Sequence, residues 1–91
     1  MKKDAVLIVG AGSLQKPMII EAQTLGLYVI TTDGNPCALA RDCADEFYVL
    51  STYDIKGHCI LTEDLVRQHN LKGVVCCGND VAPTVAAAAQ A

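Results

Sequence analysis

The chain has 91 residues, of which 52% are hydrophobic and 19% are charged, and its formal net charge at pH 7 is −3. This balance is typical of a compact globular domain and excludes an intrinsically disordered chain. An acidic chain argues against nucleic acid or an anionic membrane surface as a partner. No apolar run approaches a membrane span in length and no cleavable signal is recognisable, so we expect a cytoplasmic protein that binds small molecules.

The first half of the chain predicts a βαβ unit. A wholly apolar strand, Ala5–Val9, ends in a glycine-rich loop, Gly10–Gln15. Apolar residues at helical spacing, with a proline in the first turn, predict a helix over 16–25 that Gly26 ends. A β-branched second strand follows over 27–32, and such a crossover forces the two strands to pair in parallel.

The second half continues the alternation of strands and helices. We expect a short helix over 36–42, a strand over 46–50, a long helix from Asp54 to Asn70 and a fourth strand over 72–77. A glycine in the first turn of the long helix could interrupt it. The alanine-rich end, Val85–Ala91, predicts a helix that stops without a cap, so we expect the chain to be a fragment of a longer protein.

Four strands that alternate with helices predict an α/β fold. We expect a three-layer, Rossmann-like parallel sheet in the strand order 3-2-1-4, which forms one domain over 1–91. Such sheets bind ligands beyond the carboxyl ends of their strands, where the strand order reverses. Three polar loops should meet at this edge, and the first and third of them should flank the cleft. They are Gly10–Gln15, Asp33–Pro36 and Gly78–Asp80.

The glycine loop has two interpretations. Gly10 and Gly12 match the first two glycines of the dinucleotide-binding pattern G-x-G-x-x-G, but Gln15 stands where a third glycine would allow close helix–strand packing. The N–H groups that open the next helix could bind a phosphate or another anion. Alternatively, the loop could be a tight turn that serves packing alone.

Other polar residues near this edge also have two interpretations. Asp33 lies about twenty residues past the glycines, where the dinucleotide fold keeps its ribose-binding acid, but it could equally be a turn residue that bonds its own backbone. Asp80 is expected to cap the last helix, although it could also contact a substrate. His58 and His69 fall on the long helix, and we expect both at the surface. No nucleophile lies beside a base in these loops, so we assign no catalytic residue.

The cysteines and histidines predict no metal site. Five cysteines are an odd number below the density of a disulfide scaffold, so we expect reduced thiols. Their spacing, together with that of the two histidines, matches no zinc-binding pattern.

The whole chain resembles the N-terminal domain of ATP-grasp ligases, the domain that precedes the ATP-binding fold. The biotin-carboxylase-like and carbamoyl-phosphate-synthase-like members are the most similar. The motifs that carry the resemblance follow one another in order over nearly the whole sequence. They are Val6–Gln15 with Pro17, Leu25–Gly26, Asp33–Pro36 with Ala40, Ala44–Phe47, Gly73–Val75, and Gly78–Asp80 with Ala82.

This resemblance implies a ligase that joins a carboxylate, or bicarbonate, to an amine or another nucleophile through an acyl-phosphate made from ATP and Mg²⁺. In that family the ATP and metal residues lie in later domains, so the parent enzyme would supply a missing ATP-grasp domain. The N-terminal domain lends one wall of the cleft, and its glycine loop contacts the non-nucleotide substrate, a small carboxylate, phosphate or amine. By this resemblance, the substrate-binding residues are Gly10, Gly12, Ser13, Leu14 and Gln15, with Asp33, Asn35 and Asp80 as further candidates.

Two other classes of function stay open. A small NAD(P)-binding Rossmann module would rest on Gly10, Gly12 and Asp33, and Gln15 argues against it. A non-catalytic interaction domain would keep the fold without a ligand. The sequence also leaves a homodimer open. The alanine-rich last helix could pack against missing chain, so we expect an exposed apolar patch there in the isolated domain.

Overall fold

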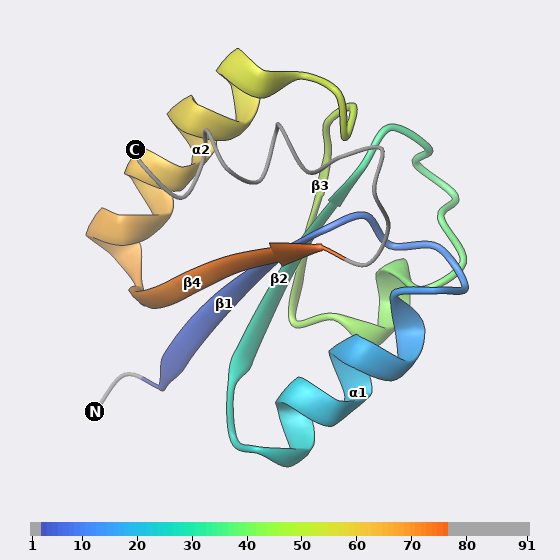
Figure 1. Cartoon of the computed structure of the whole chain (residues 1–91), viewed down its shortest axis with the longest axis vertical. Helices are drawn as coiled ribbons and strands as arrows, with labels where there is room; N and C mark the ends of the chain where they lie inside the picture. Colours follow the sequence, from blue (N-terminus) through green and yellow to red (C-terminus); the bar gives the residue numbers. More distant parts are fainter. Residues whose placement is uncertain (1–2, 77–91) are drawn as a thin grey trace.

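The computed structural model describes residues 3–76 and confirms the predicted α/β fold. All strand pairs are parallel and their order is β3-β2-β1-β4, so the expected 3-2-1-4 sheet is present. Figure 1 shows the two helices on opposite faces of this sheet, which makes three layers. The elements are β1 (Asp4–Val9), α1 (Lys16–Thr24), β2 (Tyr28–Asp33), the 3₁₀ turn η1 (Arg41–Cys43), β3 (Glu46–Val49), α2 (Ile55–Gln68) and β4 (Asn70–Cys76).

The central strand β1 is buried on both faces, as its unbroken apolar sequence predicts. Its side chains alternate between the two faces of the sheet. Val6 and Ile8 pack with Ile19 of α1, whereas Leu7 packs with Leu65 of α2. Each fully buried aliphatic side chain contributes about 1.5–3 kcal/mol. These two apolar clusters hold β1, and the loop that follows it, in a fixed position.

Helix α2 is continuous, although a glycine lies in its first turn. The Asp54 side chain caps the helix by accepting a hydrogen bond from the Gly57 N–H at 2.8 Å. A Cβ at Gly57 would lie 2.6 Å from Asp54 Oδ2 and 2.8 Å from Leu50 Cδ1. Glycine at this position therefore leaves room for the cap, and the possible interruption of the helix does not occur.

Strand β4 begins two residues earlier than expected and contains a bulge. Asn70, which we predicted at the end of the helix, is its first residue and donates to Asp4 Oδ1 at 2.6 Å. Ala5 lies opposite Leu71, but Val6 lies opposite Gly73, so one residue of β4 is skipped in the pairing. The bulge changes the alternation of side chains along β4.

The bulge shifts the residues after Lys72 to the face opposite to the one that a regular strand would give them. Leu71 and Val74 both pack on the α2 face, although three positions separate them. Val75 instead lines a shallow apolar groove of about 290 Å³ on the α1 face, between β4 and α1. Leu25, the last residue of the predicted first helix, also lines this groove and is 72% exposed.

The prediction of a short helix over 36–42 is wrong, because this segment forms only the 3₁₀ turn η1 at Arg41–Cys43. The side chains of Asp33 and Asn35 each accept a hydrogen bond from a backbone N–H two residues further on. Such contacts favour consecutive turns over a helix. The Ala40 N–H then donates to the Ala11 carbonyl oxygen at 2.8 Å, which ties this segment to the glycine loop.

The predicted loop 78–80 and the alanine-rich helix lie outside the described residues.

Candidate functional site

The glycine loop lies at the carboxyl ends of β1 and β2, where we expected it. Gly10 has a φ of +104°, a left-handed conformation that favours glycine. Its N–H donates to the Thr32 carbonyl oxygen of β2 at 2.7 Å. The loop is therefore fixed at the edge of the sheet where parallel α/β folds bind ligands.

Gln15 folds back over the glycine loop. Its side-chain Oε1 accepts a hydrogen bond from the Gly12 N–H at 2.8 Å, and its backbone N–H donates to the Gly12 carbonyl oxygen at 3.1 Å. A Cβ at Gly10 would lie 3.1 Å from Gln15 Cδ, and a Cβ at Gly12 would lie 3.2 Å from Gln15 Oε1. The space that the two glycines leave open is therefore filled by the side chain of Gln15.

Asp33 reaches the same loop from the end of β2. Its Oδ2 accepts a hydrogen bond from the Ala11 N–H at 3.0 Å, while its Oδ1 accepts one from the Asn35 N–H at 2.9 Å. Asn35 continues the turn, because its own Oδ1 accepts from the Cys37 N–H at 2.9 Å. Asp33 thus makes the turn contact that was one of its two expected roles, and it also binds the glycine loop.

Ser13 and Leu14 form the exposed tip of the loop. The Leu14 side chain is 70% exposed. Within residues 3–76, the backbone N–H groups of Ser13 and Leu14 make no hydrogen bond. The structure therefore gathers at one edge all but one of the candidate residues, namely Gly10, Gly12, Ser13, Leu14, Gln15, Asp33 and Asn35. The remaining candidate, Asp80, lies outside the described residues.

His58 is buried, so its predicted surface position was wrong. Its ring lies 2.9 Å from the Asp54 carbonyl oxygen through Nδ1 and 2.7 Å from Thr32 Oγ1 through Nε2. A carbonyl oxygen can only accept, so Nδ1 donates to Asp54, and Nε2 forms a second hydrogen bond with the Thr32 hydroxyl. The signal that could have revealed this is helical spacing, because positions 58, 61, 62 and 65 share one face of α2.

A second polar cluster lies at the opposite edge of the sheet, where the strands begin. We call it the amino-edge cluster, and it consists of Tyr28, Glu46, Tyr48 and His69. The Tyr48 hydroxyl donates to Glu46 Oε1 at 2.6 Å, and His69 Nε2 lies 2.9 Å from Glu46 Oε2. The Tyr28 and His69 rings stack with their centroids 5.0 Å apart. His69 is therefore packed into this cluster, and its side chain is only 20% exposed, contrary to the surface position that we expected.

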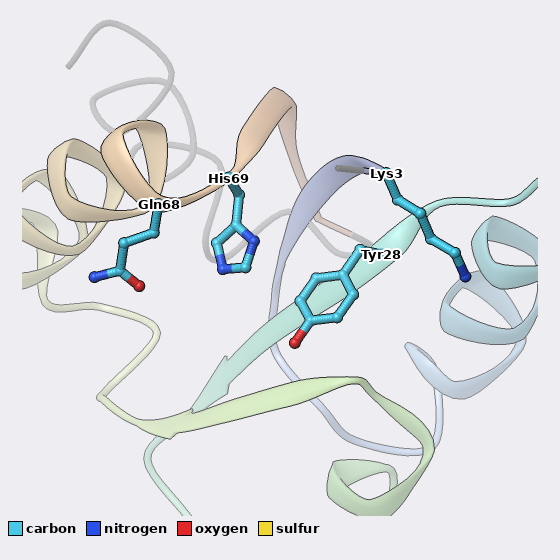
Figure 2. Close-up of a pocket in the computed structure, with 4 residues that line it drawn as sticks. All are labelled: Lys3, Tyr28, Gln68 and His69. Carbon is cyan, nitrogen blue, oxygen red and sulfur yellow. The ribbon is translucent and has the colours of Figure 1, made fainter. Parts of the chain in front are cut away.

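The open side of the amino-edge cluster is a pocket of about 300 Å³. Lys3, Tyr28, Gln68 and His69 line it, and Figure 2 shows these side chains. They come from the chain before β1, the start of β2 and the end of α2, so the pocket lies far along the sheet from the glycine loop.

Glu46 controls the ionisation of the amino-edge cluster. Its burial would raise the pKa of its carboxyl group, but hydrogen bonds from Tyr48, Tyr28 and His69 outweigh burial, so the pKa lies below its ordinary value. In return, the hydrogen bond to Glu46 is the largest cause that raises the pKa of both Tyr28 and Tyr48 from 10 to about 12. The Glu46 carboxylate is thus the shared acceptor for Tyr28, Tyr48 and His69, and these hydrogen bonds join the starts of β2 and β3 to the end of α2.

The described residues offer no metal centre. Within residues 3–76, no group of three or more His, Cys, Asp or Glu side chains could hold a metal ion. The same part of the chain contains no helix with the length and apolar character needed to cross a membrane.

A search of protein families found no family model that matches the chain. The chain is 49% identical over 49 residues to the formate-dependent phosphoribosylglycinamide formyltransferase of Hydrogenovibrio crunogenus. That match covers 54% of this chain and 12% of the relative. The chain thus spans only a small part of the relative's length.

Two solved structures share the fold over nearly the whole chain. Phosphoribosylglycinamide synthetase from Anaerococcus prevotii is 26% identical, with a TM-score of 0.80 over 96% of this chain and 22% of that protein. N5-carboxyaminoimidazole ribonucleotide synthetase from Thermotoga maritima is 32% identical, with a TM-score of 0.67 over 90% of this chain and 21% of that protein. In sequence and in fold, the chain is similar to the N-terminal domain of ATP-grasp ligases, as its motifs indicated.

Proposed function

We propose that this chain is the substrate-side domain of an ATP-dependent ligase that joins a carboxylate, or bicarbonate, to an amine through an acyl-phosphate. Its glycine loop contacts the non-nucleotide substrate. The observation that carries the proposal is the TM-score of 0.80 over 96% of the chain to a synthetase, together with a glycine loop at the ligand-binding edge of the sheet.

The names of the relatives favour a substrate that carries a phosphate. The two synthetases and the formyltransferase are all named for compounds with a phosphoribosyl or ribonucleotide group. A single phosphate suits the loop tip. Within residues 3–76 the backbone N–H groups of Ser13 and Leu14 make no hydrogen bond, and such groups near a helix N-terminus favour anions. We therefore propose a phosphate-bearing amine as the substrate class.

ATP and Mg²⁺ do not fit the residues described. Residues 3–76 hold no metal-binding cluster, and the N–H groups of Ala11 and Gly12 already bind side chains of the protein. We propose that the remainder of a longer parent enzyme supplies both, since the chain spans about a fifth of the solved relatives. The chain alone is then expected to show no ATP turnover.

The alternative of an NAD(P)-binding module is disfavoured by the same contacts. A dinucleotide needs the backbone near the second glycine for its pyrophosphate and the acid after the second strand for its ribose. The Gln15 side chain occupies the place beside Gly12 that the pyrophosphate would need. Both carboxylate oxygens of Asp33, the acid that would bind the ribose, already accept hydrogen bonds from backbone N–H groups.

A titration of the ¹⁵N-labelled chain tests the proposed function. The ligands are ribose 5-phosphate, bicarbonate, a small amine, Mg·ATP and NADH, each followed by amide chemical shifts. We expect ribose 5-phosphate to shift the amides of residues 12–15, with little response from the amino-edge cluster. Leu14→Asp places a negative charge at the loop tip and should weaken this binding, whereas Ile60→Asp on exposed α2 should not.

Three results would contradict the proposal. The first is a wild-type chain whose amides do not respond to ribose 5-phosphate. The second is saturable NADH binding that shifts Asp33 more than any phosphate does. The third is ATP hydrolysis by the isolated chain at the rate of an enzyme.

A further inference from the structure

The glycine loop has the first two glycines of a dinucleotide turn, but the space above them is used differently. In a dinucleotide site, the second glycine lets the pyrophosphate approach the backbone, and free N–H groups bind it. Here the Gly12 N–H donates to Gln15 Oε1 at 2.8 Å, and the Ala11 N–H donates to Asp33 Oδ2 at 3.0 Å. Two adjacent donors of the loop are therefore occupied by oxygens of the protein itself.

Gln15 also fills the volume over the loop. The distances of 3.1 Å and 3.2 Å from its side chain to the Cβ positions at Gly10 and Gly12 leave no gap between the glycines and the carboxamide. Its backbone is held as well, because the Gln15 carbonyl oxygen accepts from the Ile19 N–H of α1 at 2.9 Å. The two glycines thus accommodate Gln15 in the position that a ligand would otherwise take.

We propose that Gln15 and Asp33 form a specificity filter that keeps diphosphate-bearing ligands off the glycine loop and leaves its tip to a ligand with a single anionic group. The identity of the admitted ligand rests on the proposed function, whereas the exclusion rests on the contacts above. A pyrophosphate would have to displace one amide oxygen and one carboxylate from adjacent N–H groups. The carboxylate of Asp33 would also repel the second phosphate.

The experiment compares NADH binding by the wild-type chain with that of three variants at position 15. Gln15→Ala and Gln15→Gly both remove the carboxamide, whereas Gln15→Glu keeps an oxygen acceptor of the same length. NADH fluorescence gives the affinity, and circular dichroism with thermal melting shows that each variant is folded. We expect Gln15→Ala and Gln15→Gly to bind NADH about tenfold more tightly than the wild type, the effect of one freed hydrogen-bond site. Gln15→Glu should bind no better than the wild type.

Three outcomes would overturn the filter. The wild type could bind NADH as tightly as Gln15→Ala, or a folded Gln15→Ala could gain nothing. A gain confined to Gln15→Gly would show that helix packing at the third glycine position, rather than the carboxamide, excludes the dinucleotide. Failure of the proposed function would appear separately, as a wild-type chain that ignores ribose 5-phosphate, and would leave this comparison of variants intact.

Discussion

The two edges of the sheet are both polar, but they are built from different chemistry. At the carboxyl edge, side-chain oxygens of Gln15 and Asp33 bind backbone N–H groups of the glycine loop. At the amino edge, side chains bind one another, and the Glu46 carboxylate is the shared acceptor. The ionisable groups with perturbed pKa values, Tyr28, Glu46 and Tyr48, lie only at the amino edge among residues 3–76.

On the proposed function, a perturbed pKa does not by itself locate the ligand-binding edge. Structural networks of hydrogen bonds perturb pKa values as active sites do. The amino-edge cluster joins strand starts, whereas at the carboxyl edge the exposed residues Ser13 and Leu14 have N–H groups with no hydrogen bond among residues 3–76. We therefore expect mutations at the carboxyl edge to change stability and binding together, and mutations at the amino edge to change stability and its dependence on pH.

The largest effect is expected from His58→Ala, at the carboxyl edge. This change removes a fully buried ring and leaves the Thr32 hydroxyl without its partner, at a cost of about 3 kcal/mol. Urea unfolding measures the loss. Thr32→Val keeps the volume and should cost less, and the double mutant should fall short of the sum of the two. Full additivity would mean that the two side chains do not interact.

Gly57→Ala should destabilise the protein by about 2 kcal/mol, although alanine is the better helix former. The reason is the added Cβ, which would lie 2.6 Å from Asp54 Oδ2 in the cap of α2. Gly73→Ala is the matched control, because its Cβ would meet no atom of the described residues within 4 Å. Equal melting temperatures for the two variants would argue against the close contact.

A pair of isosteric changes compares the two edges directly. The two carboxylate oxygens of Asp33 accept hydrogen bonds from the Ala11 and Asn35 N–H groups, and Asp33→Asn replaces one of these oxygens by an NH₂ donor. We expect the free energy of unfolding to fall by about 1 kcal/mol. Faster exchange of the Ala11 amide with solvent should accompany it. Glu46→Gln should lower the free energy of unfolding by less than Asp33→Asn does, because the partners of Glu46 are partly exposed side chains that can reorient. A larger loss for Glu46→Gln would reverse our ranking of the two edges.

The smallest effect is the dependence of stability on pH at the amino edge. The folded pKa of Tyr48 is raised to about 12, so its contribution is present below pH 10 and is lost as the pH rises from 10 towards 12. The pKa of Glu46 is lowered, so its contribution is present above its unfolded pKa and is lost as the pH falls through the folded value. Thermal melts at a series of pH values measure both trends.

Matched variants isolate these two trends from other titrating groups. Tyr48→Phe should reduce the alkaline loss and leave the part that Tyr28 contributes, whereas Glu46→Gln should reduce both the alkaline and the acid loss. If the stability of both variants changes with pH as that of the wild type does, Glu46 is not the group that couples the ionisation of the cluster to stability.

Local patterns predicted the sheet well, because an apolar run such as 5–9 followed by a glycine has few other interpretations. The sequence also marked Gln15 as the residue that departs from the dinucleotide pattern. It could not show that Gln15 folds back onto Gly12, because spacing does not determine where a side chain points. The hydrogen bond that the Ala11 N–H donates to Asp33 joins the glycine loop to the end of β2 and has no local signal.

Other differences had a signal that the prediction did not use. His58 lies three and seven residues before Leu61 and Leu65, the spacing of a buried helical stripe. The pair Asp33 and Asn35 is typical of turns, and it outweighed the proline that suggested a short helix. The early start of β4 had none, because it depends on a contact between Asn70 and Asp4 at opposite ends of the chain.

The bulge in β4 has a consequence for how this chain is aligned with others. Because Lys72 has no counterpart in the register with β1, a relative with a regular fourth strand would carry one residue fewer between its equivalents of Leu71 and Gly73. An alignment without a gap at Lys72 would then match Val74, which lies on the α2 face, to a position on the α1 face, and Val75 to a position on the α2 face. Evolutionary comparisons of the substitutions allowed on the two faces of β4 therefore depend on where that single gap is placed.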